Sequence, residues 1–96
     1  MTYASLEQRR EARETTDIRS LSDIARDIRR NWSPVYFGAV PYLDAMRSLE
    51  GIHDSYGADS AASIVLYFLN NASTWRGPVA RAIKAELKTM IKAAGR

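Results

Sequence analysis

The chain has no cysteine, so disulfide bonds, iron–sulfur clusters and thiolate zinc sites are excluded. Its single histidine, His53, offers a transition metal no partner imidazole or thiolate, and we interpret it as a polar group of a loop or interface. The five glycines form no GxGxxG or GxxxxGK motif, and no Ser–His–Asp spacing is evident. We therefore predict that the protein is not an enzyme and needs neither cofactor nor metal.

Long hydrophobic runs are also missing. The longest uninterrupted apolar run extends from Ile64 to Leu69, far short of the roughly 20 residues that a membrane-spanning helix needs. The first seven residues lack the basic and apolar regions of a signal peptide. A chain of 96 residues is long enough to bury one hydrophobic core. We expect a single cytoplasmic domain that makes no use of a membrane.

The net charge is small, but the charged residues are unevenly placed. The formal net charge is only +3. Residues 1–72 hold eight arginines against ten acids, whereas residues 73–96 hold six basic residues against Glu86 alone. Such asymmetry is typical of a surface for nucleic acid or an acidic partner, and equally of a solvated helix face.

A regular apolar spacing predicts the first principal helix, over residues 20–32. Its apolar residues fall at i, i+3, i+4, i+7 and i+11, which is one face of a helix with 3.6 residues per turn. Ser20 is placed to cap this helix. Ser33-Pro34 is placed to end it, because the residue before proline is disfavoured in the α region. The residues on the apolar face are Leu21, Ile24, Ala25, Ile28 and Trp32.

Two further helices are predicted in the middle of the chain. Pro41 suits the first position of a helix over about 41–50, which Gly51 would end. Residues 51–58 are predicted to form a loop. A helix capped by Asp59 or Ser60 would then run to Asn71 and be apolar on almost every side, which predicts a central, enclosed position. Its residues 64–69 also have high strand propensity, but no second strand is evident to pair with them, which favours a helix.

The last helix is predicted to be capped by Thr74, with Gly77-Pro78 in its first turn and Gly95 at its end. Its apolar stripe contains Val79, Ile83, Leu87, Met90, Ile91 and Ala94. Beside it lies a basic stripe, which we define as Arg81, Lys84, Lys88 and Lys92. Phosphate contacts need cations on one face, so the basic stripe is a candidate nucleic-acid surface. No aromatic residue interleaves it for base stacking, and it is also what the solvated face of an amphipathic helix looks like.

Residues 32–42 concentrate four of the nine aromatic residues and two of the three prolines. This composition suits packing or recognition. Trp32 continues an apolar stripe, so we assign it to the core. Tyr36, Phe37 and Tyr42 are predicted to pack against the helix at 61–72. The alternative is a partly exposed Tyr36/Tyr42 pair in an interface, where aromatic side chains carry much of the binding energy. Trp75 and Arg76 have the same two interpretations, an anchor of the last helix or a protruding contact.

Five short segments within residues 20–92 carry a resemblance to known proteins: IARDI at 24–28, Trp32, VYFGAVPYL at 35–43, IVLYFL at 64–69 and TWRG at 74–77. Together they resemble a family of small uncharacterised proteins encoded by bacteriophages of actinobacteria, mycobacteriophages among them. The resemblance implies an accessory phage role in the host cytoplasm. It carries over no enzymatic activity, cofactor or catalytic residue.

These patterns predict an all-α fold, a compact bundle of four main helices in one domain over residues 20–96. A charged N-terminal helix or arm over residues 1–19 precedes it. The expected core consists of Leu21, Ile24, Ile28, Trp32, Phe37, Leu43, Met46, Leu49, Ile64, Val65, Phe68, Leu69, Ile83 and Leu87.

The expected function is that of a non-enzymatic protein that binds a host protein, a phage protein or a second copy of itself. The residues expected to form the contact are Tyr36, Tyr42, Trp75 and Arg76. The alternative is nucleic-acid binding through Arg81, Lys84, Lys88 and Lys92 of the last helix.

Overall fold

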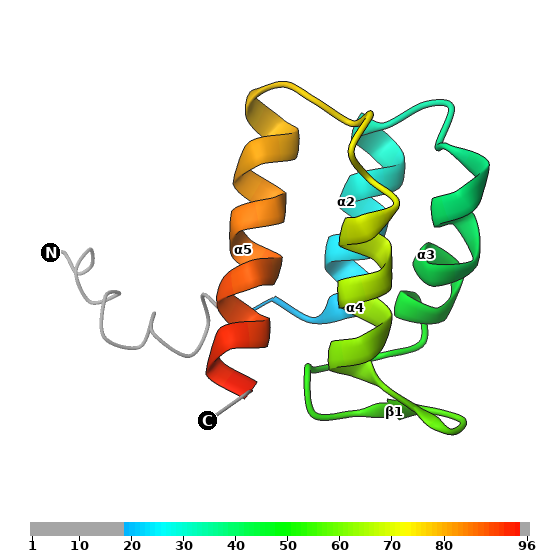
Figure 1. The fold of residues 1–96 in the computed structure, drawn as a ribbon, viewed down its shortest axis with the longest axis vertical. Coiled ribbons are helices and arrows are strands. Elements are labelled where there is room, and N and C mark those ends of the chain that lie inside the picture. The colour runs from blue at the N-terminus through cyan, green and yellow to red at the C-terminus, as the bar shows by residue number, and fades with distance from the viewer. Residues whose placement is uncertain (1–18, 95–96) are drawn as a thin grey trace, which may run out of the picture.

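The computed structural model describes residues 19–94, which form a mostly helical fold with a small antiparallel sheet. In Figure 1, α5 and α3 stand on opposite sides of the molecule, with α2 and α4 between them. The predicted arm lies outside the described residues except for Arg19, and so does Gly95. The elements are α2 (Leu21–Asn31), the 3-10 helix η1 (Phe37–Ala39), α3 (Val40–Met46), β1 (Ser55–Tyr56), β2 (Asp59–Ser60), α4 (Ala61–Asn70) and α5 (Pro78–Ala94).

Helix α2 confirms the predicted cap and apolar face. The Ser20 side chain accepts a hydrogen bond from the Asp23 backbone N–H at 3.1 Å, and the residues of the apolar face are buried. Two more N–H groups of the first turn would lack intrahelical partners. They donate instead to the chain that follows α3, from Leu21 to the Glu50 carbonyl at 2.8 Å and from Ser22 to the Leu49 carbonyl at 3.0 Å. These bonds fix the start of α2 beside the end of α3.

Helix α3 is shorter than predicted. It begins at Val40, with Pro41 in its first turn, and ends at Met46 rather than near Gly51. After Met46 the Ser48 and Leu49 N–H groups bind the carbonyls three residues back, and the Glu50 N–H donates to the Asp54 carboxylate at 2.8 Å in place of a helical carbonyl. These turn and side-chain bonds replace the continued helix that the apolar spacing predicts.

The predicted loop at 51–58 contains a strand, so the fold is not strictly all-α. Strand β1 pairs with β2 in an antiparallel hairpin, with Ser55 opposite Ser60 and Tyr56 opposite Asp59. Gly57 has a φ of 61°, the left-handed conformation that such a tight turn requires. Each strand has only two residues, which is too short to produce an alternating sequence pattern.

Helix α4 confirms the predicted Ser60 cap but not the predicted enclosure on all sides. The Ser60 hydroxyl accepts a hydrogen bond from the Ser63 N–H at 3.1 Å. Phe68 and three other side chains of α4 are buried, whereas Leu66 and Tyr67 are exposed. The helix therefore has one outward side that carries apolar groups.

Helix α5 begins at Pro78, so Thr74 is not its cap. Gly77 has a φ of 109°, which ends the preceding turn and cannot belong to a right-handed helix. Ala80, Ile83 and Leu87 are buried, while Val79, predicted in the apolar stripe, is exposed.

The core confirms twelve of the fourteen expected residues. Phe37 is the clear error, because its side chain is 78% exposed, and Leu69 is only partly buried. Within the core, the Trp32 ring meets Phe68 edge-on, with ring centroids 6.2 Å apart.

Candidate protein-binding surface

Four aromatic side chains gather where η1, α3 and α4 meet, and we define Tyr36, Phe37, Tyr42 and Tyr67 as the aromatic surface. Phe37 is 78% exposed, Tyr67 44% and Tyr36 43%, while Tyr42 is half-buried. The rings are paired. The centroids of Tyr36 and Phe37 lie 4.9 Å apart, and those of Tyr42 and Tyr67 lie 5.6 Å apart.

Gly38 and Asn71 connect the two aromatic pairs. A Cβ added at Gly38 would lie 2.6 Å from Cε2 of Tyr36 and 2.9 Å from Oδ1 of Asn71, so both groups rest against the glycine. The Asn71 side-chain amide donates to the Tyr67 carbonyl at 2.9 Å. The close approach explains the requirement for glycine here and places the Tyr36 ring next to the end of α4.

The backbone beneath Phe37 is held in place. The Ala39 N–H donates to the Tyr36 carbonyl at 2.9 Å, closing the 3-10 turn, and the Ala39 side chain is fully buried. Val35, just before the turn, packs against the core. Phe37 is thus directed outward on a turn anchored on both sides.

Trp75 is not part of this surface. It was expected among the exposed contact residues, yet it is only 4% exposed. Its indole stacks on Trp32, and its Nε1–H is directed at the Asn31 carbonyl at 3.4 Å. The neighbouring Arg76 is exposed. Of the two interpretations open for Trp75, the structure supports the anchor of the last helix.

The sequence does not predict two members of the aromatic surface: its pattern places Phe37 in the core and Tyr67 in an enclosed helix. A three-residue turn has no apolar period from which the direction of Phe37 could be read. For Tyr67, the signal is its tyrosine hydroxyl, a polar tip that favours the surface within an otherwise apolar run.

The basic stripe retains three exposed cations, Arg81, Lys88 and Lys92. Lys84 is partly buried, and its Nζ donates to the Trp75 carbonyl at 2.6 Å. Burial lowers the pKa of Lys84, and the nearby charges of Lys88 and Arg76 lower it further. Lys84 therefore links α5 to the turn before it.

An ion-pair network holds the opposite flank of α5. The Arg19 guanidinium binds both carboxylate oxygens of Glu86, at 2.8 and 3.1 Å, and also pairs with Asp27 of α2. The hydrogen bond to Glu86 raises the pKa of Arg19 most, and the hydrogen bond from Arg19 lowers the pKa of Asp27. Glu86 thus faces α2, away from the basic stripe.

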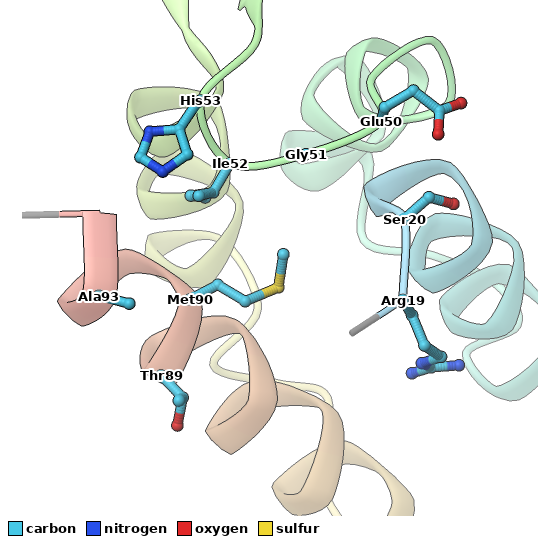
Figure 2. A pocket seen from close by; sticks show the side chains of 9 residues that line it. All are labelled: Arg19, Ser20, Glu50, Gly51, Ile52, His53, Thr89, Met90 and Ala93. Carbon is cyan, nitrogen blue, oxygen red and sulfur yellow. The ribbon is translucent and has the colours of Figure 1, made fainter. Parts of the chain in front are cut away.

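His53 lies at the rim of a mostly apolar groove of about 530 Å³, whose walls include Ile52 and Met90. Figure 2 shows the His53 ring and the Glu50 carboxylate pointing away from each other on either side of Gly51. Arg19, also at the rim, is occupied by Glu86 and Asp27. This arrangement assembles no acid–base pair. Within residues 19–94, no group of three or more His, Asp or Glu side chains could hold a metal.

No family model matches the chain, and no curated protein or solved structure gives a significant match. In the part of the chain that the structure describes, none of the helices combines the length and apolar character needed to cross a bilayer.

Proposed function

We propose that this protein is a non-enzymatic binding protein whose aromatic surface contacts a host protein, a phage protein or a second copy of the chain. The observation that carries the proposal is the exposure of Phe37, 78%, on a turn anchored by buried neighbours. Burying a side chain of this size stabilises a complex by roughly 1.5–3 kcal/mol. An accessory phage role in the host cytoplasm belongs to the same proposal and rests on the sequence resemblance.

Pre-organisation supports this assignment. The Tyr36 ring rests on Gly38, and the Tyr67 ring packs on Tyr42. Ordering a flexible side chain at an interface costs about 0.5–1.5 kcal/mol, and rings already held in place avoid much of that cost. Tyrosine adds a hydroxyl that can form a hydrogen bond at the rim, as aromatic hot spots commonly do.

The test compares Phe37→Ala and Tyr67→Ala with Tyr56→Ala in pull-downs from host lysate and in light scattering after size exclusion. Tyr56 is a matched control because its side chain is 48% exposed but lies on the β1–β2 hairpin. We expect the first two variants to lose the partner, or the self-association, that the control retains. Recovery of the same partners by all three folded variants would remove the aromatic surface from the proposal.

Nucleic-acid binding through the basic stripe is the second candidate. The observation that favours it is the exposure of Arg81, Lys88 and Lys92 on one flank of α5. If three phosphates are neutralised, log affinity should fall against log salt with a slope of about −2 to −3. This candidate is rejected if the affinity for nucleic acid does not change with salt concentration, or if Lys88→Glu binds as tightly as the parent chain.

A further inference from the structure

A second groove, between α2 and the end of α3, is lined by polar and charged side chains. Its volume is about 550 Å³, and its lining consists of Ser22, Arg26, Arg29, Asp44, Arg47 and Ser48. Three guanidinium groups thus face one carboxylate. This groove is separate from the aromatic surface and from the basic stripe.

The lining side chains form two rows. The spacing of residues along α2 defines one row, and two backbone hydrogen bonds hold the second row beside it. Ser22, Arg26 and Arg29 occupy positions i, i+4 and i+7 on one face of α2. The second row, Asp44 to Ser48, lies at the end of α3, which is held beside the start of α2 through the Leu49 and Glu50 carbonyls. The two rows therefore face each other at a fixed spacing.

The guanidinium groups of the groove have N–H donors that are not used in ion pairs. Arg29 Nη2 donates to Asp44 Oδ1 at 2.6 Å, and at the rim Arg26 Nη1 donates to Asp23 Oδ1 at 2.7 Å. Arg47 has no carboxylate partner within residues 19–94. An arginine carries five N–H donors, so one ion pair leaves most of them unused. The groups that line the groove carry a formal charge of +2.

We propose that this groove binds a phosphate monoester. Such a group carries a charge of about −1.5 to −2 at pH 7 and three acceptor oxygens, which matches the excess charge and the guanidinium donors of the lining. A carboxylate would supply only one charge. The Ser22 hydroxyl, 3.0 Å from that of Ser20, is a further polar group of the groove, whereas the Ser48 hydroxyl already donates to the Ala45 carbonyl. The volume of the groove leaves room for the group to which the phosphate is esterified.

A nucleic-acid backbone running over both this groove and the basic stripe does not fit the geometry. Glu86 faces α2 through Arg19, whereas Lys84 reaches the Trp75 carbonyl on the opposite flank of α5. The basic stripe follows Lys84, so it lies away from α2 and its arginines. The groove is therefore suited to one compact phosphate group, carried by a free small molecule or by a phosphorylated side chain of a partner.

The test is a calorimetric and NMR titration of the full chain with inorganic phosphate, at constant ionic strength in chloride. We expect Arg47→Gln and Arg29→Gln to weaken phosphate binding about tenfold, because each removes a charge-assisted donor. Asp44→Asn removes the one carboxylate of the lining and should tighten binding about threefold or more. Asp59→Asn is the matched control, since it changes net charge equally from the exposed strand β2 and should leave the affinity unchanged.

Two further titrations identify the source of the phosphate. Tighter binding of adenosine monophosphate than of a phosphoserine peptide supports a free nucleotide-like ligand, and the reverse supports a phosphorylated protein. Circular dichroism confirms that each variant is folded. The proposal is overturned if folded Arg47→Gln and Arg29→Gln both bind phosphate as well as the parent chain, or if Asp59→Asn has the same effect as Asp44→Asn. Duplex DNA that binds more tightly, and that depends on Lys88 rather than Arg47, also overturns it.

Discussion

The indole ring of Trp32 stacks on that of Trp75, with ring centroids 5.4 Å apart and planes 10° from parallel. This contact joins the residue that follows α2 to the turn that precedes α5, 43 positions later in the chain. Both rings are buried, and Trp32 also meets Phe68 of α4. One end of the helical bundle is therefore closed by three aromatic side chains from distant parts of the sequence.

Removing the Trp75 ring should destabilise the fold strongly. Truncation of a buried tryptophan costs about 3–5 kcal/mol, because apolar contacts are lost and a cavity remains. We expect Trp75→Ala to lower the free energy of unfolding by that amount in urea denaturation. Arg76→Ala is the control, because an exposed side chain should change stability by about 0.5 kcal/mol or less. Equal stability of the two variants would show that the stacking contact does not hold the bundle.

Substitution of Gly38 should disturb the aromatic surface more than the core. A Cβ at this position would lie 2.6 Å from Cε2 of Tyr36, so the ring must move outward, and Asn71 must also shift. We expect Gly38→Ala to destabilise by about 1 kcal/mol, near the lower limit for overpacking, because the Tyr36 side chain is partly exposed and can yield.

The control for Gly38 is Gly51→Ala, since an added Cβ there meets no atom within 4 Å. It should leave stability unchanged or raise it slightly, because alanine restricts the unfolded chain. NMR shifts of the Tyr36 and Phe37 rings report the movement. Unchanged ring shifts in Gly38→Ala would mean that the Tyr36 ring does not rest on the glycine.

The caps and the helical faces could be predicted from the sequence, because both are local. Ser20 and Ser60 each precede an apolar period and accept the expected backbone hydrogen bond. The end of α3 could not be predicted in this way, because the Glu50 and Gly51 N–H groups bind a loop carboxylate, Asp54, instead of helical carbonyls. Trp75 could not be placed either, since its stacking partner Trp32 is remote in the chain.

The candidate sites also contain residues that a local pattern predicts and residues that only tertiary packing brings together. Tyr36 and Tyr42 were recognised from the aromatic density of one segment, whereas Tyr67 joins them only through the packing of α4 on α3. The arginine-lined groove was not expected at all. Its residues come from two segments. The basic excess of α2 is a single charge, since Asp23 and Asp27 alternate with its three arginines, and this excess is too small to identify the groove.

Acid should weaken the contact between α2 and α5. The hydrogen bond from Arg19 lowers the pKa of Asp27, so the folded state releases this proton at a lower pH than the unfolded state does. The stabilisation is complete above the unfolded value of about 4 and is lost as pH falls through the lower, folded value. We expect the free energy of unfolding of Asp27→Asn to depend less on pH below about 4 than that of the parent chain.

Arg19→Met tests the cause of this acid dependence. It removes the guanidinium that lowers the pKa of Asp27 and should flatten the same part of the pH profile. Some dependence should persist in both variants, because the Glu50 and Gly51 N–H groups independently lower the pKa of Asp54. A profile of Arg19→Met that follows the parent chain would show that the ion pair does not set the acid response.

Lys84 should make the free energy of unfolding depend on pH in the alkaline range. Burial lowers its pKa, so the folded state releases this proton at a lower pH than the unfolded state, whose value is about 10.4. Between the folded and unfolded values the unfolded chain binds more protons, and the free energy of unfolding should rise with pH. Lys84→Met should remove this rise, whereas Lys92→Met, which removes the same charge from an exposed position that does not act on the pKa of Lys84, should retain it. If Lys84→Met and the parent chain show the same alkaline slope, Lys84 is solvated, and it belongs with Arg81, Lys88 and Lys92 as a fourth exposed cation of the basic stripe.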